Sequence, residues 1–92
     1  MQQMYFVKTE VIPGKVDELA RKIVRDEIPS VEGNVVYVTS DGRFGYNLIE
    51  GTSEDEVRHK FDQYRDYIII REITPILPMG QFIERWKAQR AA

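Results

Sequence analysis

The sequence predicts an α+β chain whose elements follow the order β-α-β-β-α-β, with one further helix at the C-terminal end. Segments rich in aromatic and β-branched residues alternate with stripes of apolar residues at helical spacing. Proline, glycine and aspartate stand between these segments, where they favour turns. The 92 residues, 42% hydrophobic and 30% charged, are typical of one globular domain, which we place at residues 1–92.

The first half of the chain predicts three strands and one helix. Residues 4–12 alternate in part between apolar and polar side chains and form the first predicted strand, which a Pro-Gly pair ends. Apolar residues at helical spacing then predict a helix over residues 16–28. Residues 34–40 and 44–50 predict the next two strands, and the Asp-Gly pair between them is a strong signal for a β-hairpin turn.

The second half predicts a helix, a strand and a short C-terminal helix. Thr52 or Ser53 is suited to cap the first of these helices, and the acidic residues 54–56 suit the positive end of its dipole. The apolar stripe of this helix consists of Val57, Phe61 and Tyr64. Residues 67–73 predict the fourth strand, which a Thr-Pro pair ends, and the last helix starts at Gln81. The apolar side of that helix is formed by Phe82, Ile83 and Trp86.

This order is the split βαβ, or ferredoxin-like, pattern, in which four antiparallel strands carry both helices on one face. Right-handed crossovers place the first and third strands in the centre of the sheet. The other face needs a cover, because residues 68–70 are apolar on both sides of the fourth strand and the first strand has no purely polar side. We therefore expect a homodimer, in which two such sheets face each other as a dimeric α/β barrel and the C-terminal helix is a dimer arm.

Three segments carry a resemblance to a known superfamily: residues 4–7 (MYFV), residues 44–51 (FGYNLIEG) and residues 70–77 (IREITPIL). With these segments the chain resembles the dimeric α/β-barrel superfamily, and it is most similar to a family of small bacterial and archaeal proteins of unknown function. Better-known relatives are muconolactone isomerases, cofactor-independent monooxygenases and haem-degrading monooxygenases. The resemblance implies a pocket between the sheet and the helices, but no catalytic residue carries over to this sequence.

The predicted function is the binding of a small organic, aromatic molecule in that pocket. The candidate ligand-binding residues are Phe6, Tyr37, Tyr46 and Asn47. Aromatic rings are suited to contact a flat ligand, and an amide inside an otherwise apolar strand can orient a carbonyl or a phenol. The alternative for the aromatic residues is a place in the hydrophobic core.

An enzyme is the first alternative function, namely a cofactor-independent lactone isomerase or monooxygenase. Its candidate catalytic residues are Glu10 or Glu72 as the base, with Lys8 or a tyrosine as an orienting donor, since the first and fourth strands should be neighbours. A carboxylate in an apolar pocket can have a raised pKa and transfer protons. The same three residues could equally form an interfacial ion pair or reach water at the strand ends.

An RNA-binding module is the second alternative, because RNA-recognition domains share the β-α-β-β-α-β order. Residues 43–47 (RFGYN) partly match the aromatic motif that these domains carry on the third strand. The glycine that should follow the basic residue is missing, however, and Asn47 replaces an apolar residue. The net charge of -2, from 13 basic and 15 acidic residues, is also opposite to that of most nucleic-acid-binding proteins. We therefore expect no nucleic-acid partner.

Several further classes of site are not expected. The sequence has no cysteine, no glycine-rich phosphate loop and no metal-ligand spacing, so we expect no metal and no cofactor. His59, the single histidine, should point away from the apolar stripe of its helix. No apolar segment is long enough to cross a membrane, and the polar start is unlike a signal peptide. We accordingly expect a cytoplasmic protein with no membrane partner.

Overall fold

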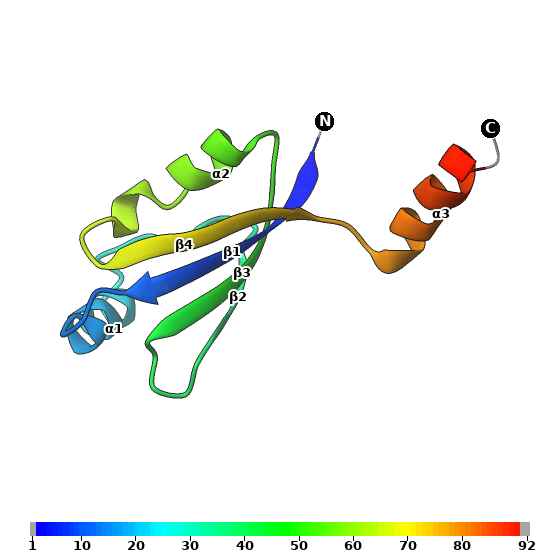
Figure 1. Ribbon diagram of the computed structural model, residues 1–92. Helices are drawn as coiled ribbons and strands as arrows, with labels where there is room; N and C mark the ends of the chain where they lie inside the picture. Colours follow the sequence, from blue (N-terminus) through cyan, green and yellow to red (C-terminus); the bar gives the residue numbers. More distant parts are fainter. Residues whose placement is uncertain (1, 91–92) are drawn as a thin grey trace.

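The computed structural model describes residues 2–90, which form a four-stranded sheet and three α-helices (Figure 1). The elements are β1 (Gln3–Val11), α1 (Val16–Val24), β2 (Val35–Val38), β3 (Phe44–Gly51), α2 (Glu54–His59), β4 (Ile68–Ile76) and α3 (Met79–Arg90). Within the described residues, no helix is both long and apolar enough to cross a bilayer. The cytoplasmic location stays a prediction.

The strands are antiparallel and lie in the order β2-β3-β1-β4. The predicted α+β class and the central position of the first and third strands are therefore confirmed. This topology, with α1 and α2 as the two connecting helices, is compatible with a ferredoxin-like fold.

The hydrophobic core lies between the sheet and the helices α1 and α2. Its buried residues are Tyr5, Val7, Val11, Leu19, Ile28, Ile49, Val57 and Phe61. Successive side chains of a strand point to opposite faces, so Tyr5, Val7 and Thr9 of β1 define the helix face of the sheet. The alternate residues of β1, Phe6 and Lys8 among them, lie on the other side, which we call the open face.

Helix α1 and strand β4 end at different residues than predicted. The helix stops at Val24, because Asp26 adopts the left-handed conformation with φ 56°. Ile28, which the sequence places at the end of the helix, is buried from the following loop instead. Strand β4 continues through Pro75 to Ile76, since an edge strand has one side on which proline's missing N–H costs no ladder hydrogen bond.

The N-terminal cap of α2 agrees with the sequence, but the helix ends earlier than the spacing of its apolar residues predicts. Ser53 is the cap, and its hydroxyl accepts a hydrogen bond from the Glu56 backbone N–H at 3.1 Å. The helix ends at His59, and a 3-10 turn over Asp62–Tyr64 carries the chain onward to β4. Val57 and Phe61 nevertheless both reach the core, as their spacing predicts.

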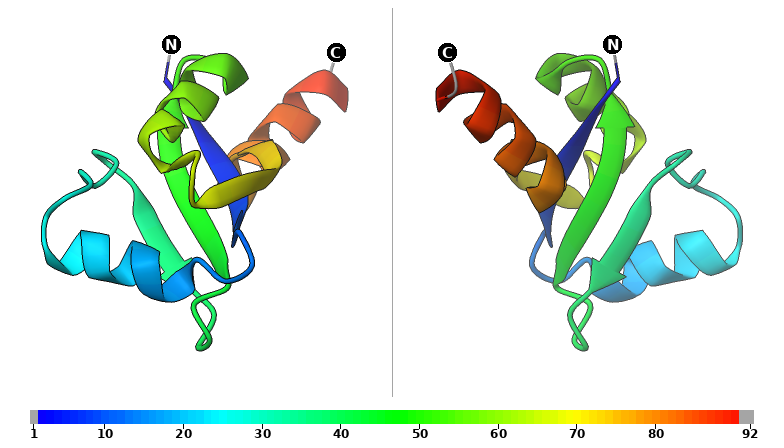
Figure 2. Two further views of the ribbon diagram at one scale, coloured as in Figure 1. Left: turned by 90° about the vertical axis from the view of Figure 1, so that its left-hand side faces the viewer. Right: turned by 90° about the vertical axis from the view of Figure 1, so that its right-hand side faces the viewer.

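Helix α3 starts two residues earlier than predicted and extends away from the rest of the chain, beyond the end of β4 (Figure 1). Figure 2 shows α3 and α1 on opposite sides of the sheet. None of the α3 residues is buried, and the exposed fractions of Phe82, Ile83 and Trp86 are 53%, 39% and 44%. The apolar side of α3 is therefore left without a packing partner within the described chain.

Candidate functional site

A cavity of about 330 Å³ lies between α1 and the helix face of the sheet. Helix α1 contributes apolar side chains that include Leu19 and Ile23, and β2 contributes Val36 and Val38. These two valines are 51% and 63% exposed although they lie on the side of the sheet that the helices cover. The helix therefore leaves the β2 edge partly uncovered, and this gap is the cavity.

Two glycines at the wall of the cavity leave little room for a side chain, and Gly45 leaves the least. A Cβ atom on Gly45 would lie 2.6 Å from the Thr9 hydroxyl oxygen, far inside van der Waals contact. Gly42, in the turn of the β2–β3 hairpin, has φ +74°, and a Cβ there would lie 3.1 Å from a methyl group of Val16. Bare backbone at these positions lets the hairpin approach β1 and α1 closely.

Two asparagine side chains supply a fixed polar feature in the apolar wall. Asn47 is 2% exposed, and its Nδ2 donates to the Val7 backbone carbonyl at 2.9 Å. The Asn47 Oδ1 accepts from Asn34 Nδ2 at 2.8 Å. The remaining amide oxygen, Asn34 Oδ1, is buried and finds no hydrogen-bond partner among residues 2–90. Both asparagines are among the residues that line the cavity, but this oxygen is itself shielded from solvent.

The cavity wall is uncharged. None of the described residues that line it is Asp, Glu, Lys, Arg or His. Burial raises the pKa of Tyr64, and the hydroxyl of this residue donates to the Pro29 carbonyl at 2.8 Å. The tyrosine therefore stays neutral near pH 7, so no group of the described wall can act as a general base there.

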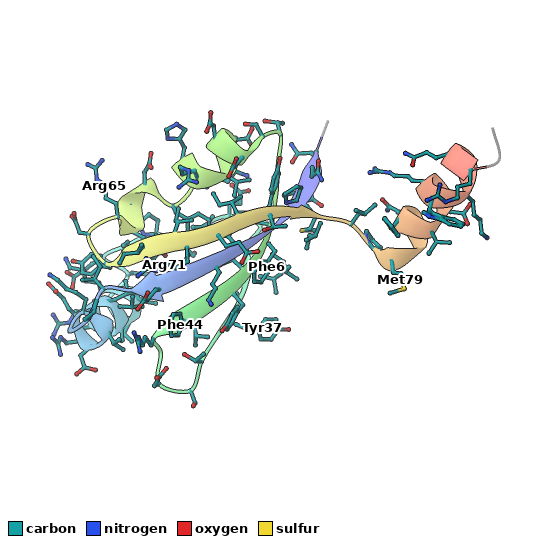
Figure 3. All side chains as sticks on the ribbon, viewed as in Figure 1. Phe6, Tyr37, Phe44, Arg65, Arg71 and Met79 are labelled. Carbon is teal, nitrogen blue, oxygen red and sulfur yellow. The ribbon has the colours of Figure 1, made fainter. Side chains whose placement is uncertain are left out.

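The predicted ligand-binding residues are divided between the two faces of the sheet. Asn47 lines the cavity, whereas Phe6, Tyr37 and Tyr46 lie on the open face. Phe6 stacks on Tyr46 with the ring centroids 6.2 Å apart and the planes at 22°. Figure 3 labels Phe6 and Tyr37, which come from β1 and β2. Tyr37 is opposite Tyr46 in the β2–β3 register, so the structure brings the three aromatics together on the open face but separates them from the amide.

The sequence does not predict that Asn34 and the α1 side chains belong to the site. Asn34 lies in a loop, where a single asparagine is an ordinary residue. The apolar stripe of α1 is visible in the sequence, but it is equally the signature of a helix packed on a core without any cavity. Only the parity of β3, with Gly45 and Asn47 on one side, could have indicated that these two positions face a helix together.

The predicted catalytic residues, Lys8, Glu10 and Glu72, lie on the open face, away from the cavity. Lys8 is opposite Glu72 in the β1–β4 register, as the sequence suggests. The carboxylate of Glu10, however, is held by two arginines: Arg71 Nη2 lies 2.7 Å from its Oε1, and Arg43 Nη2 lies 3.0 Å from its Oε2. Figure 3 labels Arg71, which comes from β4.

The arginines reverse the pKa shift that the enzyme alternative requires of Glu10. Hydrogen bonds from Arg71 and then Arg43 lower the pKa of Glu10, although its burial acts in the opposite direction. Arg71 reaches the carboxylate because the β1–β4 register shifts between Lys8 and Thr9, which leaves Arg71 as an extra residue. A strand irregularity of this kind has no signature in the sequence, so the sequence does not predict the ion pairs of Glu10 with Arg43 and Arg71.

Comparison with known proteins does not place this chain in a family. The resemblance to the dimeric α/β-barrel superfamily, carried by residues 4–7, 44–51 and 70–77, stays a prediction. The function is therefore inferred from the geometry of the cavity. No protein-family model, no curated protein and no solved structure matches the chain.

Proposed function

We propose that this protein binds a small organic molecule in the cavity between α1 and the helix face of the sheet. The observation that carries the proposal is an apolar cavity with one rigid amide pair in its wall. Ligand sites in proteins have volumes of roughly 300–1,000 Å³ and combine apolar walls with a few placed polar groups. A volume of about 330 Å³ is at the lower end of this range, which favours a compact ligand.

Binding without proton transfer fits the cavity better than the enzyme alternative. An isomerase or oxygenase of the expected kind needs a base within hydrogen-bond reach of its substrate. The candidate bases Glu10 and Glu72 lie on the other face of the sheet, and the pKa of Glu10 is lowered rather than raised. The polar side chains of the described wall carry only amide and hydroxyl groups.

We also propose that a second copy of the chain covers the open face, so that two sheets form a dimeric α/β barrel. Apolar side chains are exposed there on neighbouring strands: Val35 is 52%, Tyr37 69% and Leu48 38% exposed. An exposed apolar surface of this kind marks an interaction site in many proteins. Helix α3, with its own exposed apolar side, extends on the same side of the sheet (Figure 2).

An RNA strand is the competing occupant of the open face, because Phe44 and Tyr46 lie there with basic neighbours. Those basic groups are already engaged, however. Arg43 and Arg71 pair with Glu10, and the Lys8 ammonium lies 5.3 Å from the Phe44 ring centroid. With few free cations to neutralise phosphates, this face suits a protein surface better than a nucleic acid.

The ligand-binding proposal can be tested with phenol and toluene as probes and NMR shifts of the Gly45 and Asn47 amides as the readout. Val36→Trp should fill the cavity and abolish the shifts. Val35→Trp is the matched control, because this neighbouring valine is exposed to the same extent but lies on the open face. The absence of shifts with both probes, or equal shifts in the two variants, would contradict the proposal.

A further inference from the structure

We infer that the part of the ligand that enters this cavity is an uncharged hydrocarbon group, a ring or a short chain, which makes no hydrogen bond to the wall. The inference rests on the proposed function, since it specifies the chemical class of the molecule that the cavity binds. It depends on three observations: the wall carries no charge, its polar side chains are engaged or enclosed, and several of its apolar side chains are half exposed.

The absence of charge in the described wall excludes an ionic group from the cavity. A charged group that entered would lose its hydration without gaining a counter-ion. Removing an ion from water under these conditions is strongly unfavourable. The ion pairs of Glu10 with Arg43 and Arg71 lie on the open face, so the sheet separates them from the cavity. The group that enters is therefore neutral.

The two amide side chains form hydrogen bonds within the protein. Asn47 is 2% exposed, its Nδ2 donates to the Val7 carbonyl, and its Oδ1 accepts from Asn34 Nδ2. The Asn34 Oδ1 is shielded from solvent, so a molecule in the cavity cannot reach it. Asn47 thus joins β3 to β1 and to the loop before β2, and neither amide oxygen is left as an acceptor for a ligand.

The hydroxyl groups of the wall are also engaged, enclosed or at the surface. The Tyr64 hydroxyl donates to the Pro29 carbonyl at 2.8 Å. Thr9 is 7% exposed, and its hydroxyl oxygen lies close to Gly45, only 2.6 Å from where a Cβ atom would be. Ser30 is in the exposed loop after α1. A ligand hydroxyl inside the cavity would therefore lose its bonds to water without an equivalent replacement, which is unfavourable.

The apolar side chains of the wall favour a hydrocarbon group directly. Ile23, Val36 and Val38 line the cavity and are 50%, 51% and 63% exposed. Covering them stabilises a complex in proportion to the apolar area that is removed from water. A hydrocarbon ring or chain provides this cover from inside the cavity, and any polar part of a larger ligand stays in water.

Three probes with the same ring test this selectivity: p-xylene, hydroquinone and terephthalate. They carry a methyl, a hydroxyl or a carboxylate group at both ends of the ring, so one such group enters whichever end is inserted. Titrations of the full chain under nitrogen at pH 7 are followed by the amide shifts of Gly45 and Asn47. The dissociation constant of p-xylene should be at least about tenfold below that of hydroquinone. Terephthalate should cause no shifts at these amides.

A matched pair of substitutions assigns the selectivity to the wall of the cavity rather than to the hydrophobicity of the probe. Val36→Thr replaces one methyl group of the wall by a hydroxyl group and should narrow the preference for p-xylene by about threefold or more. Val35→Thr makes the same change at an equally exposed valine of the open face and should leave the preference unaltered. An unchanged preference in Val36→Thr, or the same change in both variants, would overturn the inference.

The outcomes separate this inference from the proposed function. Binding of hydroquinone as tightly as p-xylene would overturn the inference, as would shifts of the Gly45 and Asn47 amides with terephthalate, but both would leave ligand binding intact. The absence of shifts with every probe, phenol and toluene included, would overturn the proposed function itself. The comparison of p-xylene with hydroquinone on the unmodified chain decides the matter even if Val36→Thr does not fold.

Discussion

The two faces of one sheet have opposite chemical character, although alternate residues of the same strands build both. On the helix face, Val7 and Thr9 of β1 contribute to the core and to an uncharged cavity. On the open face, Lys8 and Glu10 belong to a surface with paired charges and exposed aromatic rings. The candidate ligand site and the candidate catalytic residues are therefore separated by the sheet itself, which is why we propose binding rather than proton-transfer chemistry.

The largest difference between the faces should appear in two neighbouring residues of β3. Ile49 is 1% exposed on the helix face, and Leu48 is 38% exposed on the open face. Ile49→Ala should lower the free energy of unfolding by about 2–5 kcal/mol because it leaves a cavity in the core. Leu48→Ala should change it by no more than about 0.5 kcal/mol in dilute solution. Urea denaturation measures both values, and an equal loss in dilute solution would show that the open face is packed within the monomer.

A smaller effect is expected where the hairpin approaches β1. Gly45→Ala places a methyl group against the Thr9 hydroxyl and should lower the free energy of unfolding by about 1–3 kcal/mol. The additional substitution Thr9→Ala should recover most of this loss in a double-mutant cycle. Gly80→Ala is the control, because nothing lies within 4 Å of a Cβ there. Strictly additive losses for Gly45→Ala and Thr9→Ala would contradict the close contact.

The ion pairs of Glu10 should make the open face pH-sensitive. The folded-state pKa of Glu10 lies below its ordinary value of 4.5, because the arginines stabilise the ionised form. Its contribution to stability is therefore present above pH 4.5 and is lost as the pH falls through the lowered pKa. Glu10→Gln should be less stable than the unmodified chain at pH 7, and the two should converge at acidic pH.

The effect of Glu10→Gln should be smaller than that of the core substitutions, since both arginine side chains are about half exposed and water screens the pairs. Thermal melting between pH 7 and pH 3 measures the difference. Glu50→Gln, which alters an exposed carboxylate of β3, serves as the control. A constant difference over this pH range would show that the ionised form of Glu10 is not what stabilises the fold.

The smallest effect on the monomer is expected in α3. Phe82→Ala combined with Trp86→Ala should change the unfolding free energy of the dilute monomer by no more than about 0.5 kcal/mol, because neither side chain is buried. If α3 is a dimer arm, the same double variant should weaken the dimer, as measured by sedimentation at increasing concentration. A less stable dilute monomer would instead place α3 against its own chain, and an unchanged dimer would exclude the arm.

The order of the elements and much of their extent could be predicted from the sequence, because they depend on local patterns. The Asp-Gly turn, the cap at Ser53 and the spacing of Val57 and Phe61 each depend on residues a few positions apart. The ends of α1 and β4 could not, since they depend on a left-handed Asp26 and on the edge position of β4. The sequence predicts that the strand ends before Pro75, whereas in the structure this proline is part of β4.

The candidate site required the tertiary structure, because both parities of the strands contain apolar residues. Tyr5 and Val7 on one side of β1 and Phe6 on the other have similar sequence character, and only the docking of α1 and α2 decides which side is buried. The sequence by itself determined that an amide would interrupt β3 at Asn47 and that the chain would be α+β. The long-range packing decided that Asn47 meets Asn34 beside an apolar cavity and that Glu10 meets Arg71, because such contacts join residues that no local pattern links.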